Sequence, residues 1–418
     1  MKASPYQISN RDWLDRAETR QLMEALDPAG QNNVAHFVGG VVRDAFLGRP
    51  IKDVDIATVL TPQEVTDRLE AAGIKVVPTG VAHGTVTAVV DHTPFEITTL
   101  RHDVETYGRH ARVAFTDNWL ADAARRDFTM NALYCDLEGN IFDPVGGVED
   151  LLASRVRFIG RAEDRIEEDA LRILRFFRFQ AWYGKGDVDS EGLAAAITRA
   201  DDLDRLSAER VRDEILKLLG APDPVPVLRL MIDTGVMRHV LPEVEKEVEK
   251  LDRLQHLVRL EEALDDTDRI RRLGALLPDG SASAGARLRL SKREQIRLSD
   301  MIAPRPDIAP GIAQDSLGRQ GRVALYRLGR EGFRDHALLN WAEAGGKPDD
   351  RDWTAYLEAG MAWPIPEFPL RGRDLIASGM KPGPGLGDML DTLETWWIAR
   401  DFGPDKAELI ERALKRTG

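Results

Sequence analysis

The sequence predicts an α+β protein in which a head with a small mixed β-sheet is followed by an all-helical neck, body and tail. Strand-like runs of apolar or alternating residues are confined to residues 1–150. Beyond residue 150 such runs nearly vanish, and helical segments separated by short polar breaks continue to the end of the chain. Aromatic residues make up only 6% of the chain, whereas Arg, Leu, Ala and Glu abound, and this composition favours helices over strands.

Size and composition restrict the class of protein. The chain of 418 residues is too long for one hydrophobic core, and its 43% of hydrophobic residues exclude wholesale disorder. Cys135 is the single cysteine, which excludes a disulfide framework and a zinc site built from cysteines. No apolar run reaches the roughly 20 residues that cross a bilayer, and the polar first residues are not a signal peptide. We therefore expect a soluble, cytoplasmic protein without a membrane partner.

The formal net charge of −13 argues against nonspecific binding to nucleic acids. It does not exclude a nucleic-acid substrate, because affinity for phosphate depends on local basic patches. Arginines do cluster at several places after residue 150, although some of these clusters are expected to be ordinary helix faces with Arg–Glu pairs.

The elements of the head follow from local patterns. Apolar or alternating runs predict strands, and Gly-Gly, Thr-Pro and Glu-Gly pairs mark where an element begins or a chain turns. The predicted elements are a strand at Val34–Val38, a helix at Val41–Leu47, a strand at Asp53–Thr58, a helix at Thr61–Gly73, a hairpin of Val86–Val90 with Phe95–Leu100, and a hairpin of Leu133–Asp136 with Asn140–Phe142. The polar segment Arg101–His110 has no clear period, so we expect a mobile loop there.

The remainder of the chain is predicted to be helical. Residues 161–183 and 207–219 show strong helical patterns. Prolines at Pro304–Gly311 and Pro364–Pro369 predict breaks between helical parts. We expect a head at residues 1–150, a neck at 151–220, a body at 221–303 and a tail at 304–418.

The first candidate site is the pair Gly39-Gly40 between the first strand and the helix that follows. Glycines there let a phosphate approach the backbone, and free N–H groups at the start of the helix would receive its charge. Arg43 lies one turn into the helix and could grip a phosphate with two hydrogen bonds. A glycine pair of this kind can equally be a plain structural turn.

The second candidate is Asp53-Val54-Asp55, ten residues beyond Arg43. Residues i and i+2 of a strand project from one face, so the two carboxylates would converge and repel each other unless a cation lies between them. Hard oxygen ligands favour Mg²⁺ held together with substrate phosphates. The alternative is an exposed acidic strand end. The glycine pair upstream, as a candidate phosphate site, favours the metal site over this alternative.

Two-metal phosphoryl transfer usually needs a third carboxylate. Glu96 is the best candidate, because it is a polar residue among the alternating β residues of its strand. Asp127 is its rival, and Glu96 could instead form an ion pair with a nearby arginine.

The order of these motifs resembles the class II tRNA nucleotidyltransferases. This family contains the CCA-adding enzymes and the bacterial poly(A) polymerases, within the polymerase-beta-type nucleotidyltransferase superfamily. The resemblance covers roughly residues 34–220. It rests on Gly39-Gly40-Val41-Val42-Arg43-Asp44, Lys52-Asp53-Val54-Asp55-Ile56-Ala57-Thr58, Arg125-Arg126-Asp127-Phe128-Thr129-Met130-Asn131-Ala132-Leu133, the segment from Glu168 to Phe179, and Glu209-Arg210-Val211-Arg212-Asp213-Glu214.

The resemblance implies a role for individual residues. It places metal binding on Asp53 and Asp55, with Mg²⁺ as the cofactor. It implies that nucleotide-binding residues include Gly40 and Arg43 at the phosphates, Arg126, the base-reading pair Asp169 and Arg172, and then Arg175 and Arg178 of the same motif.

A helix would explain how such a pair chooses a base. Residues three apart on a helix differ by about 60° around its axis, so Asp169 and Arg172 would lie side by side. The carboxylate accepts and the guanidinium donates, which matches the amino group and ring nitrogen shared by cytosine and adenine and mismatches uracil and guanine. Arg178 would lie about 180° from Asp169. It could therefore touch the nucleotide, form a structural ion pair, or face RNA phosphates.

Three functions remain open at this point. The first is a CCA-adding enzyme that extends tRNA with C, C and A from CTP and ATP and releases pyrophosphate. The second is a poly(A) polymerase or an A-adding tRNA nucleotidyltransferase with the same chemistry, and the third is a noncatalytic RNA-binding protein. In the first case the helical remainder would hold the tRNA by its shape, through phosphate and 2′-hydroxyl contacts. The sequence does not determine the oligomeric state.

Overall fold

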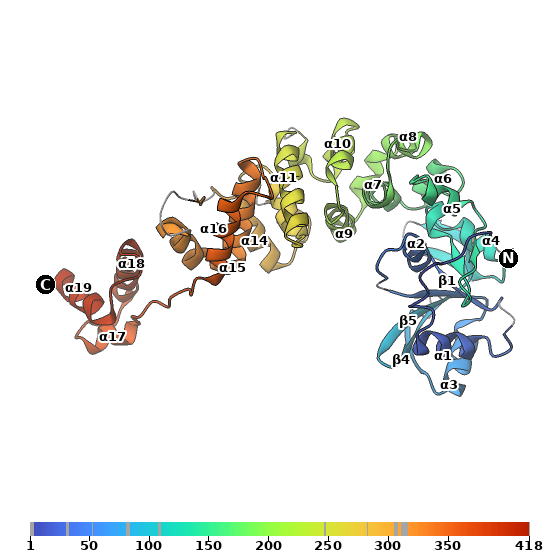
Figure 1. Cartoon of the computed structure of the whole chain (residues 1–418), viewed down its shortest axis with the longest axis horizontal. Coiled ribbons are helices and arrows are strands. Elements are labelled where there is room, and N and C mark those ends of the chain that lie inside the picture. The colour runs from blue at the N-terminus through green and yellow to red at the C-terminus, as the bar shows by residue number, and fades with distance from the viewer. Residues whose placement is uncertain are drawn as a thin grey trace. The chain divides into compact units, whose positions relative to one another are not determined.

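The computed structural model describes residues 4–30, 33–51, 53–80, 84–107, 110–245, 248–281, 283–304, 308–310 and 317–417. The chain divides into two compact units, Met1–Pro242 and Glu243–Gly418. Figure 1 shows that the first unit contains all of the labelled strands, and that the second is built from helices. Each unit is described by itself.

The first unit is built around a mixed sheet of seven strands in the order β3-β4-β5-β2-β1-β8-β9. Strands β2 and β5 run parallel, and the other neighbouring strands of this sheet run antiparallel. A separate two-stranded sheet joins β6 and β7. The strands are β1 (Ala35–Val38), β2 (Asp55–Thr58), β3 (Lys75–Gly80), β4 (Thr85–Val90), β5 (Thr93–Thr99), β6 (Arg101–Tyr107), β7 (His110–Phe115), β8 (Tyr134–Cys135) and β9 (Ile141–Phe142).

Helices of the first unit flank the sheet and then form a helical region after it. Helices α1 and α3 pack on each other and on β3 and β4, while α7 packs against α9 and α10. The helices are α1 (Ala17–Leu26), α2 (Gly40–Phe46), α3 (Pro62–Ala71), α4 (Trp119–Ala124), η2 (Thr129–Asn131), α5 (Gly147–Leu152), α6 (Ala162–Glu168), α7 (Leu171–Tyr183), α8 (Ser190–Thr198), η3 (Ala200–Arg205), α9 (Ala208–Leu219), α10 (Val225–Asp233) and η4 (Met237–His239).

The predicted elements of the head are confirmed, with one shift that matters for the site. The Thr61 hydroxyl and the Glu64 carboxylate form a capping box that begins α3 after Pro62. Strands β4 and β5 form the predicted hairpin, and its turn residues Asp91 and His92 both have positive φ. Strand β2 begins only at Asp55, so Asp53 lies in the segment that enters the strand.

The prediction of a loop at Arg101–His110 was wrong. The described residues of this segment form strands β6 and β7, which pair antiparallel from Arg101 with Phe115 to Tyr107 with His110. The register shifts between Asp103 and Glu105, which marks a bulge. The two strands are held together by backbone hydrogen bonds, which any residue type can form. The sequence of the segment therefore has no apolar alternation that would predict strands.

The helical pattern predicted over residues 161–183 is confirmed, but it is divided by a break that the sequence does not indicate. Helix α6 ends at Glu168, and α7 begins at Leu171. Between them Asp169 has an extended backbone, with φ −155° and ψ 107°. Its side chain accepts a hydrogen bond from the Leu171 N–H at 3.1 Å, so Asp169 lies just before α7 and binds the first N–H of that helix.

The second unit is helical throughout its described elements. A buried ion cluster joins several of them: Arg271 and Arg272 both donate to Glu261, at 2.9 and 2.6 Å, and Arg271 also donates to Asp335 at 2.9 Å. These two arginines therefore stabilise the interior of this unit. Its helices are α11 (Glu249–Ala263), α12 (Arg269–Leu276), α13 (Ser283–Arg287), α14 (Lys292–Ile302), α15 (Gly318–Glu343), α16 (Arg351–Ala362), α17 (Gly372–Ala377), α18 (Pro384–Ala399) and α19 (Lys406–Thr417), and η5 (Pro242–Val244) lies at the division between the units.

Residues 364–370 connect α16 to α17 without helix or strand, as the prolines predict. The chain divides once by packing, after Pro242, which is none of the predicted boundaries at residues 150, 220 and 303. The four-part division into head, neck, body and tail stays a prediction. Over the described residues, none of the helices has the length and apolar character that a membrane span requires.

Candidate active site

The carboxylates of the head meet where β2 and β5 run side by side. Asp55 is the direct partner of Glu96 in the parallel ladder, so both side chains leave the same face of the sheet. Burial raises the pKa of Asp55 above its usual range, Glu96 and Asp53 raise it further, and Arg126 opposes them. Asp55 is thus repelled by two other carboxylates beside one arginine, and a cation would relieve that repulsion.

The same face is open enough to admit substrate. Glu96 and Asp53 are exposed and Asp55 is partly buried. Within the described residues, no group of three or more His, Cys, Asp or Glu side chains is placed so that it could hold a metal ion by itself. This arrangement fits Mg²⁺, which protein carboxylates often hold through one or two contacts while substrate phosphates and water complete the octahedron.

Asp127, the rival third carboxylate, is engaged elsewhere. It accepts hydrogen bonds from Arg175 Nε at 2.7 Å, Asn131 Nδ2 at 2.9 Å and the Phe128 N–H at 2.8 Å. Burial alone would raise its pKa, but Arg175 and these hydrogen bonds lower it to about 2. A carboxylate committed to an arginine in this way is a structural anion, so the geometry favours Glu96.

The glycine turn lies between two guanidinium groups. Gly39 precedes α2 with φ +75°, a conformation that favours glycine. A Cβ atom at Gly39 would lie 3.7 Å from Arg126 Nη1, and one at Gly40 would lie 3.6 Å from Arg43 Nη2. The Gly39 N–H donates to the Leu133 carbonyl at 3.1 Å, so what the turn offers is backbone without a side chain beside two positive charges, which lets a phosphate come close.

Asp122 fixes the position of Arg126. Its carboxylate is 1% exposed and accepts from Arg126 Nη2 at 2.9 Å, from Arg125 Nη2 at 2.6 Å and from the Tyr134 hydroxyl at 2.9 Å. Burial would raise the pKa of Asp122, yet Arg126 and Arg125 lower it below its usual range. The Arg126 guanidinium also lies 5.6 Å from the centre of the Tyr134 ring. Sequence reasoning missed Asp122, although its i, i+4 spacing to Arg126 was a usable signal.

Arg43 is buried and held from three sides. Its Nη1 donates to Asn131 Oδ1 at 2.6 Å, and its Nε and Nη2 each donate to the Asp44 carboxylate at 3.0 Å. The Tyr183 ring lies under its guanidinium, with 4.2 Å between the ring centre and Cζ. Its approach to the glycine turn is thus fixed before any ligand binds.

In the neck, Asp169 and Arg172, which are predicted to read the base together, each bind other residues. Asp169 accepts from Arg210 Nη2 of α9 at 2.7 Å. Arg172 donates to Glu168, to the Arg165 carbonyl at 2.8 Å and to the Arg125 carbonyl at 3.1 Å. Asp169 lies before α7 and not within a helix, so the helical period does not fix its position relative to Arg172.

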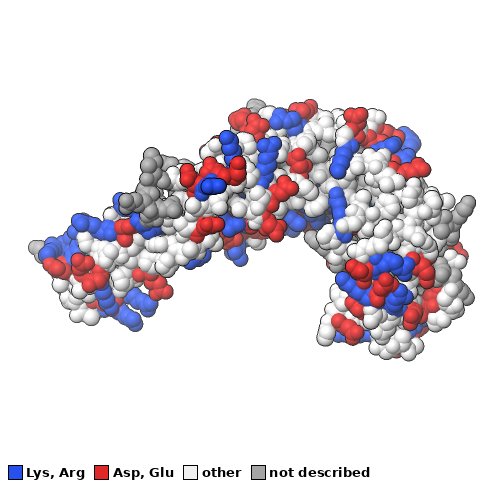
Figure 2. Space-filling view, viewed as in Figure 1, with Lys and Arg blue, Asp and Glu red and all other residues white. Residues whose placement is uncertain are grey.

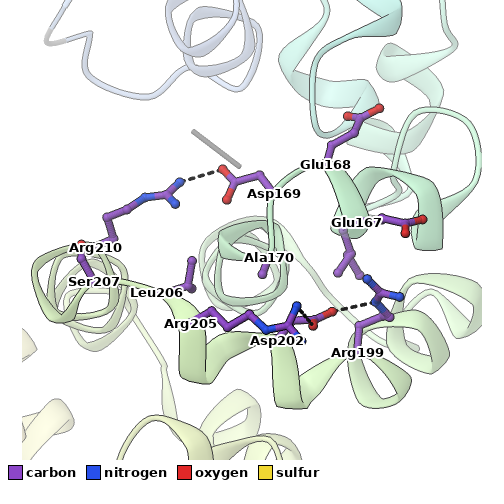
Figure 3. A pocket seen from close by; sticks show the side chains of 11 residues that line it. Glu167, Glu168, Asp169, Ala170, Arg199, Asp202, Arg205, Leu206, Ser207 and Arg210 are labelled. Atoms are coloured by element: carbon purple, nitrogen blue, oxygen red, sulfur yellow. Dashed lines mark hydrogen bonds and ion pairs between the residues drawn. The ribbon is translucent and has the colours of Figure 1, made fainter. Parts of the chain in front are cut away.

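Asp169 and Arg210 lie on the wall of a cavity of about 500 Å³. Figure 3 shows the Asp169 carboxylate pointing to Arg210 on one side, and Arg199 and Arg205 gathered around Asp202 on the other. The remaining lining comes from the end of α6 and from Ala170, Leu206 and Ser207, which precede α7 and α9. The cavity therefore presents both hydrogen-bond acceptors and donors next to a predicted base-reading residue.

Arg175 and Arg178, the last two predicted nucleotide-binding residues, are both paired with carboxylates. Arg175 binds Asp127, and Arg178 Nε donates to Glu214 Oε2 at 2.5 Å. Glu214 is 3% exposed and also lies 3.9 Å from Arg175. Of the alternatives for Arg178, the structure shows the ion pair.

In the view of Figure 2, basic and acidic side chains are interspersed over the face of each unit.

Comparison with known proteins places these features in a family. Residues 35–157 match the family model described as the poly A polymerase head domain, and residues 187–248 match a probable RNA and SrmB-binding site of polymerase A. The mitochondrial CCA tRNA nucleotidyltransferase 1 of Mus musculus is 33% identical over 397 residues, which cover 93% of this chain and 88% of that protein. The chain belongs to the CCA tRNA nucleotidyltransferase family.

Bacterial members of the family show the same extent of similarity. The CCA-adding enzyme of Latilactobacillus sakei is 31% identical over 407 residues and is matched over 98% of its length, with 96% of this chain. The crystal structure of the Bacillus stearothermophilus CCA-adding enzyme in complex with CTP aligns over 96% of this chain and 98% of that chain, with a TM-score of 0.77 and 28% identity. Fold and sequence therefore agree along nearly the whole chain. Nucleotidyltransferases of this family are typically metal-dependent.

Proposed function

We propose that this nucleotidyltransferase adds C, C and A to the 3′ end of tRNA, uses CTP and ATP, and releases pyrophosphate. The observation that carries the proposal is the in-register pair of Asp55 and Glu96 beside Arg126 and the glycine turn, in a chain of this family. Its bacterial relatives are named CCA-adding enzymes, and its vertebrate relatives CCA tRNA nucleotidyltransferases.

The head residues divide the chemistry between them. Asp53, Asp55 and Glu96 would hold Mg²⁺, which when bound supplies charge neutralisation at the attacking and leaving oxygens. The 3′-hydroxyl of the tRNA attacks the α-phosphorus, a new phosphodiester bond forms, and the bond to pyrophosphate breaks. The hydroxyl proton passes to water on the face that carries Asp53 and Glu96, both of which are exposed to solvent.

Arginines around the turn would receive the triphosphate. Arg126 and Arg43 flank Gly39 and Gly40, so a phosphate that approaches the backbone of this turn would meet both guanidiniums. Asp122 and Asp44 keep these arginines in place. Arg175 and Arg178 are further candidates. Each guanidinium would have to bind the nucleotide in addition to its present carboxylate partner.

Base selection would take place at Asp169. The carboxylate accepts a hydrogen bond from the exocyclic amino group that cytosine and adenine share, and it repels the carbonyl that uracil and guanine place there. Arg172 is the proposed donor to the ring nitrogen, for which it has to leave Glu168 and the two backbone carbonyls. Asp169 lies in the break between α6 and α7, and Arg172 lies in the first turn of α7.

Nucleotide use tests the proposal against its alternative, a poly(A) polymerase or an A-adding tRNA nucleotidyltransferase. Purified protein is incubated with tRNA that lacks its terminal trinucleotide and with CTP, ATP, UTP or GTP singly. A CCA-adding enzyme incorporates CMP from CTP alone and completes the trinucleotide when ATP is added. An A-adding enzyme or poly(A) polymerase incorporates only AMP, and a noncatalytic RNA-binding protein incorporates nothing.

The place of action is proposed to be the cytoplasm. Some relatives are mitochondrial enzymes, so fractionation of cells that produce the tagged protein is the direct test. Recovery in an organelle or membrane fraction would contradict it.

A further inference from the structure

Tyr183, the last residue of α7, reaches from the neck to the helix that follows the glycine turn. Its hydroxyl donates to Asp44 Oδ1 at 3.0 Å. Its ring lies under Arg43, with 4.2 Å from the ring centre to Cζ, and Arg49 is 4.4 Å from the same ring centre. The ring stacks on Phe179 one turn earlier, at 5.6 Å between ring centres and an angle of 26°.

The Arg43–Asp44 pair is one that a helix does not form unaided. Neighbouring residues on a helix point about 100° apart, so their side chains do not face each other. Nevertheless Arg43 donates two hydrogen bonds to Asp44, both of 3.0 Å. Tyr183 explains this geometry, because its hydroxyl holds the carboxylate while its ring face attracts the guanidinium.

The position in which Arg43 is held is the one that the phosphate site requires. Its Nη2 lies 3.6 Å from where a Cβ atom of Gly40 would be, and its Nη1 donates to Asn131 at 2.6 Å. Only 7% of Arg43 is exposed, so the stack on Tyr183 is largely shielded from water. A cation on an aromatic face is held more strongly in such surroundings than at an exposed site.

We infer that Tyr183 is a positioning residue for nucleotide addition, which preorganises Arg43 and Asp44 for the triphosphate at the glycine turn. The inference rests on the proposed function, since it takes Arg43 as a phosphate ligand. Tyr183 touches no reacting atom; it removes the need to order the Arg43 side chain when the nucleotide binds. Because the contact involves phosphates and not the base, it serves CTP and ATP alike.

The test is a steady-state comparison of four variants on tRNA that lacks its terminal trinucleotide. Tyr183→Leu removes the ring and the hydroxyl and is expected to raise KM for CTP and for ATP about tenfold, which corresponds to about 1.4 kcal/mol. The value of kcat should stay within about threefold of the wild type. Tyr183→Phe keeps the ring and is expected to raise KM about threefold. The ratio of kcat/KM for CTP over UTP stays at the wild-type value, because base selection is untouched.

Arg43→Ala and the double variant Arg43→Ala/Tyr183→Leu complete the cycle. If Tyr183 acts through Arg43, the double variant is no worse than Arg43→Ala. Trp182→Leu is the matched control: it removes the neighbouring aromatic of α7, whose Nε1 donates to the Lys217 carbonyl, and it should leave KM for both nucleotides unchanged.

Each outcome bears on one claim. An unchanged KM in Tyr183→Leu, a lower KM, or losses that add in the double variant would overturn the inference. If Tyr183→Leu fails to fold, Tyr183→Phe decides, and an unchanged KM for that variant overturns it too. If Arg43→Ala itself leaves KM unchanged, the proposed role of Arg43 at the phosphates fails, and this result is distinguishable because it does not depend on Tyr183.

Discussion

Asp55 and Glu96 lie directly opposite each other on the parallel strands β2 and β5. These residues are 41 positions apart in the chain, and no local pattern links them. The parallel pairing puts both carboxylates on one face. There, burial and the charge of Glu96 both raise the pKa of Asp55. A cation site is the arrangement in which such a pair becomes favourable.

Removal of either strand carboxylate should abolish catalysis without unfolding the protein. Asp55→Ala and Glu96→Gln each lose a proposed metal contact, and we expect kcat to fall at least a thousandfold in single-turnover assays with CTP and Mg²⁺. Asp53→Ala should behave likewise. Far-UV circular dichroism and tRNA binding should stay at wild-type values, because Asp53 and Glu96 are exposed.

Glu70→Gln is the control for this series, since it removes an exposed carboxylate of the same head on α3. It should keep full activity. Retention of a tenth of the wild-type kcat by both Asp55→Ala and Asp53→Ala would contradict the metal assignment.

Loss of the Asp169 carboxylate should relax the choice of nucleotide. Asp169→Ala removes the group that accepts from the amino group of CTP and repels the carbonyl of UTP, so the ratio of kcat/KM for CTP over UTP should fall at least tenfold, about 1.4 kcal/mol. Arg172→Ala should slow CTP and ATP alike, because both bases lose the proposed donor. Equal slowing of all four nucleotides in Asp169→Ala would mean that this residue serves only as the partner of Arg210.

Much of this site could be predicted from the sequence, because its parts are local. The glycine pair, the aspartates at 53 and 55 and the hairpin of β4 and β5 each lie within a few residues and follow from turn chemistry and alternation. Glu96 could be singled out as a polar residue in a strand. Its register against Asp55 could not, because strand order is decided by packing of the whole sheet.

The neck was predicted less well, since its partners come from other elements. Helix period places Arg172 beside Asp169, but the helix breaks at Asp169 and Arg210 of α9 binds that carboxylate instead. Asp127 illustrates the same limit: its sequence motif made it a rival metal ligand, and only the fold shows Arg175 against it. Such side-chain choices depend on long-range geometry that no spacing rule contains.

Asp127→Asn should lower the free energy of unfolding. Removal of one partner of a buried ion pair costs roughly 3–5 kcal/mol, and we expect about 2–3 kcal/mol here because 30% of the Arg175 side chain is exposed. Urea unfolding at pH 7 measures the loss. Asp164→Asn is the control, since its pair with Arg161 at 3.4 Å is exposed on both sides and should contribute less than about 1 kcal/mol. Equal stability of the two variants would contradict a stabilising role for the Asp127–Arg175 pair.

Binding of tRNA should weaken with salt despite the net charge of −13. A protein that contacts several phosphates releases counterions, so a plot of log K against log salt concentration should be linear with a slope of several units between about 50 and 200 mM. Fluorescence anisotropy with labelled tRNA gives the slope. A flat response would contradict a phosphate-contacting helical remainder.

His36 should make the protein sensitive to mild acid. It lies in the middle of β1 with 0% exposure, between the rings of Trp119 and Phe142, each 4.7 Å away between ring centres. Neither ring nitrogen has a hydrogen-bond partner among the described residues. Burial therefore favours the neutral ring and lowers the pKa of His36 from 6.5 to about 4.

The sign of the pH effect follows from which state binds the proton. Between pH 6.5 and 4 the unfolded chain holds a proton on His36 and the folded chain does not, so stability is full above pH 6.5 and falls as the pH drops toward 4. The loss attributable to this one residue is about 3 kcal/mol at most. His36→Phe cannot be protonated, and its free energy of unfolding should change less over this interval than that of the wild type. Asp127 titrates below this window, with a pKa of about 2, so it does not obscure the comparison. Parallel curves for His36→Phe and the wild type, measured by urea unfolding at half-unit steps of pH, would show that the buried ring is not the acid-sensitive group.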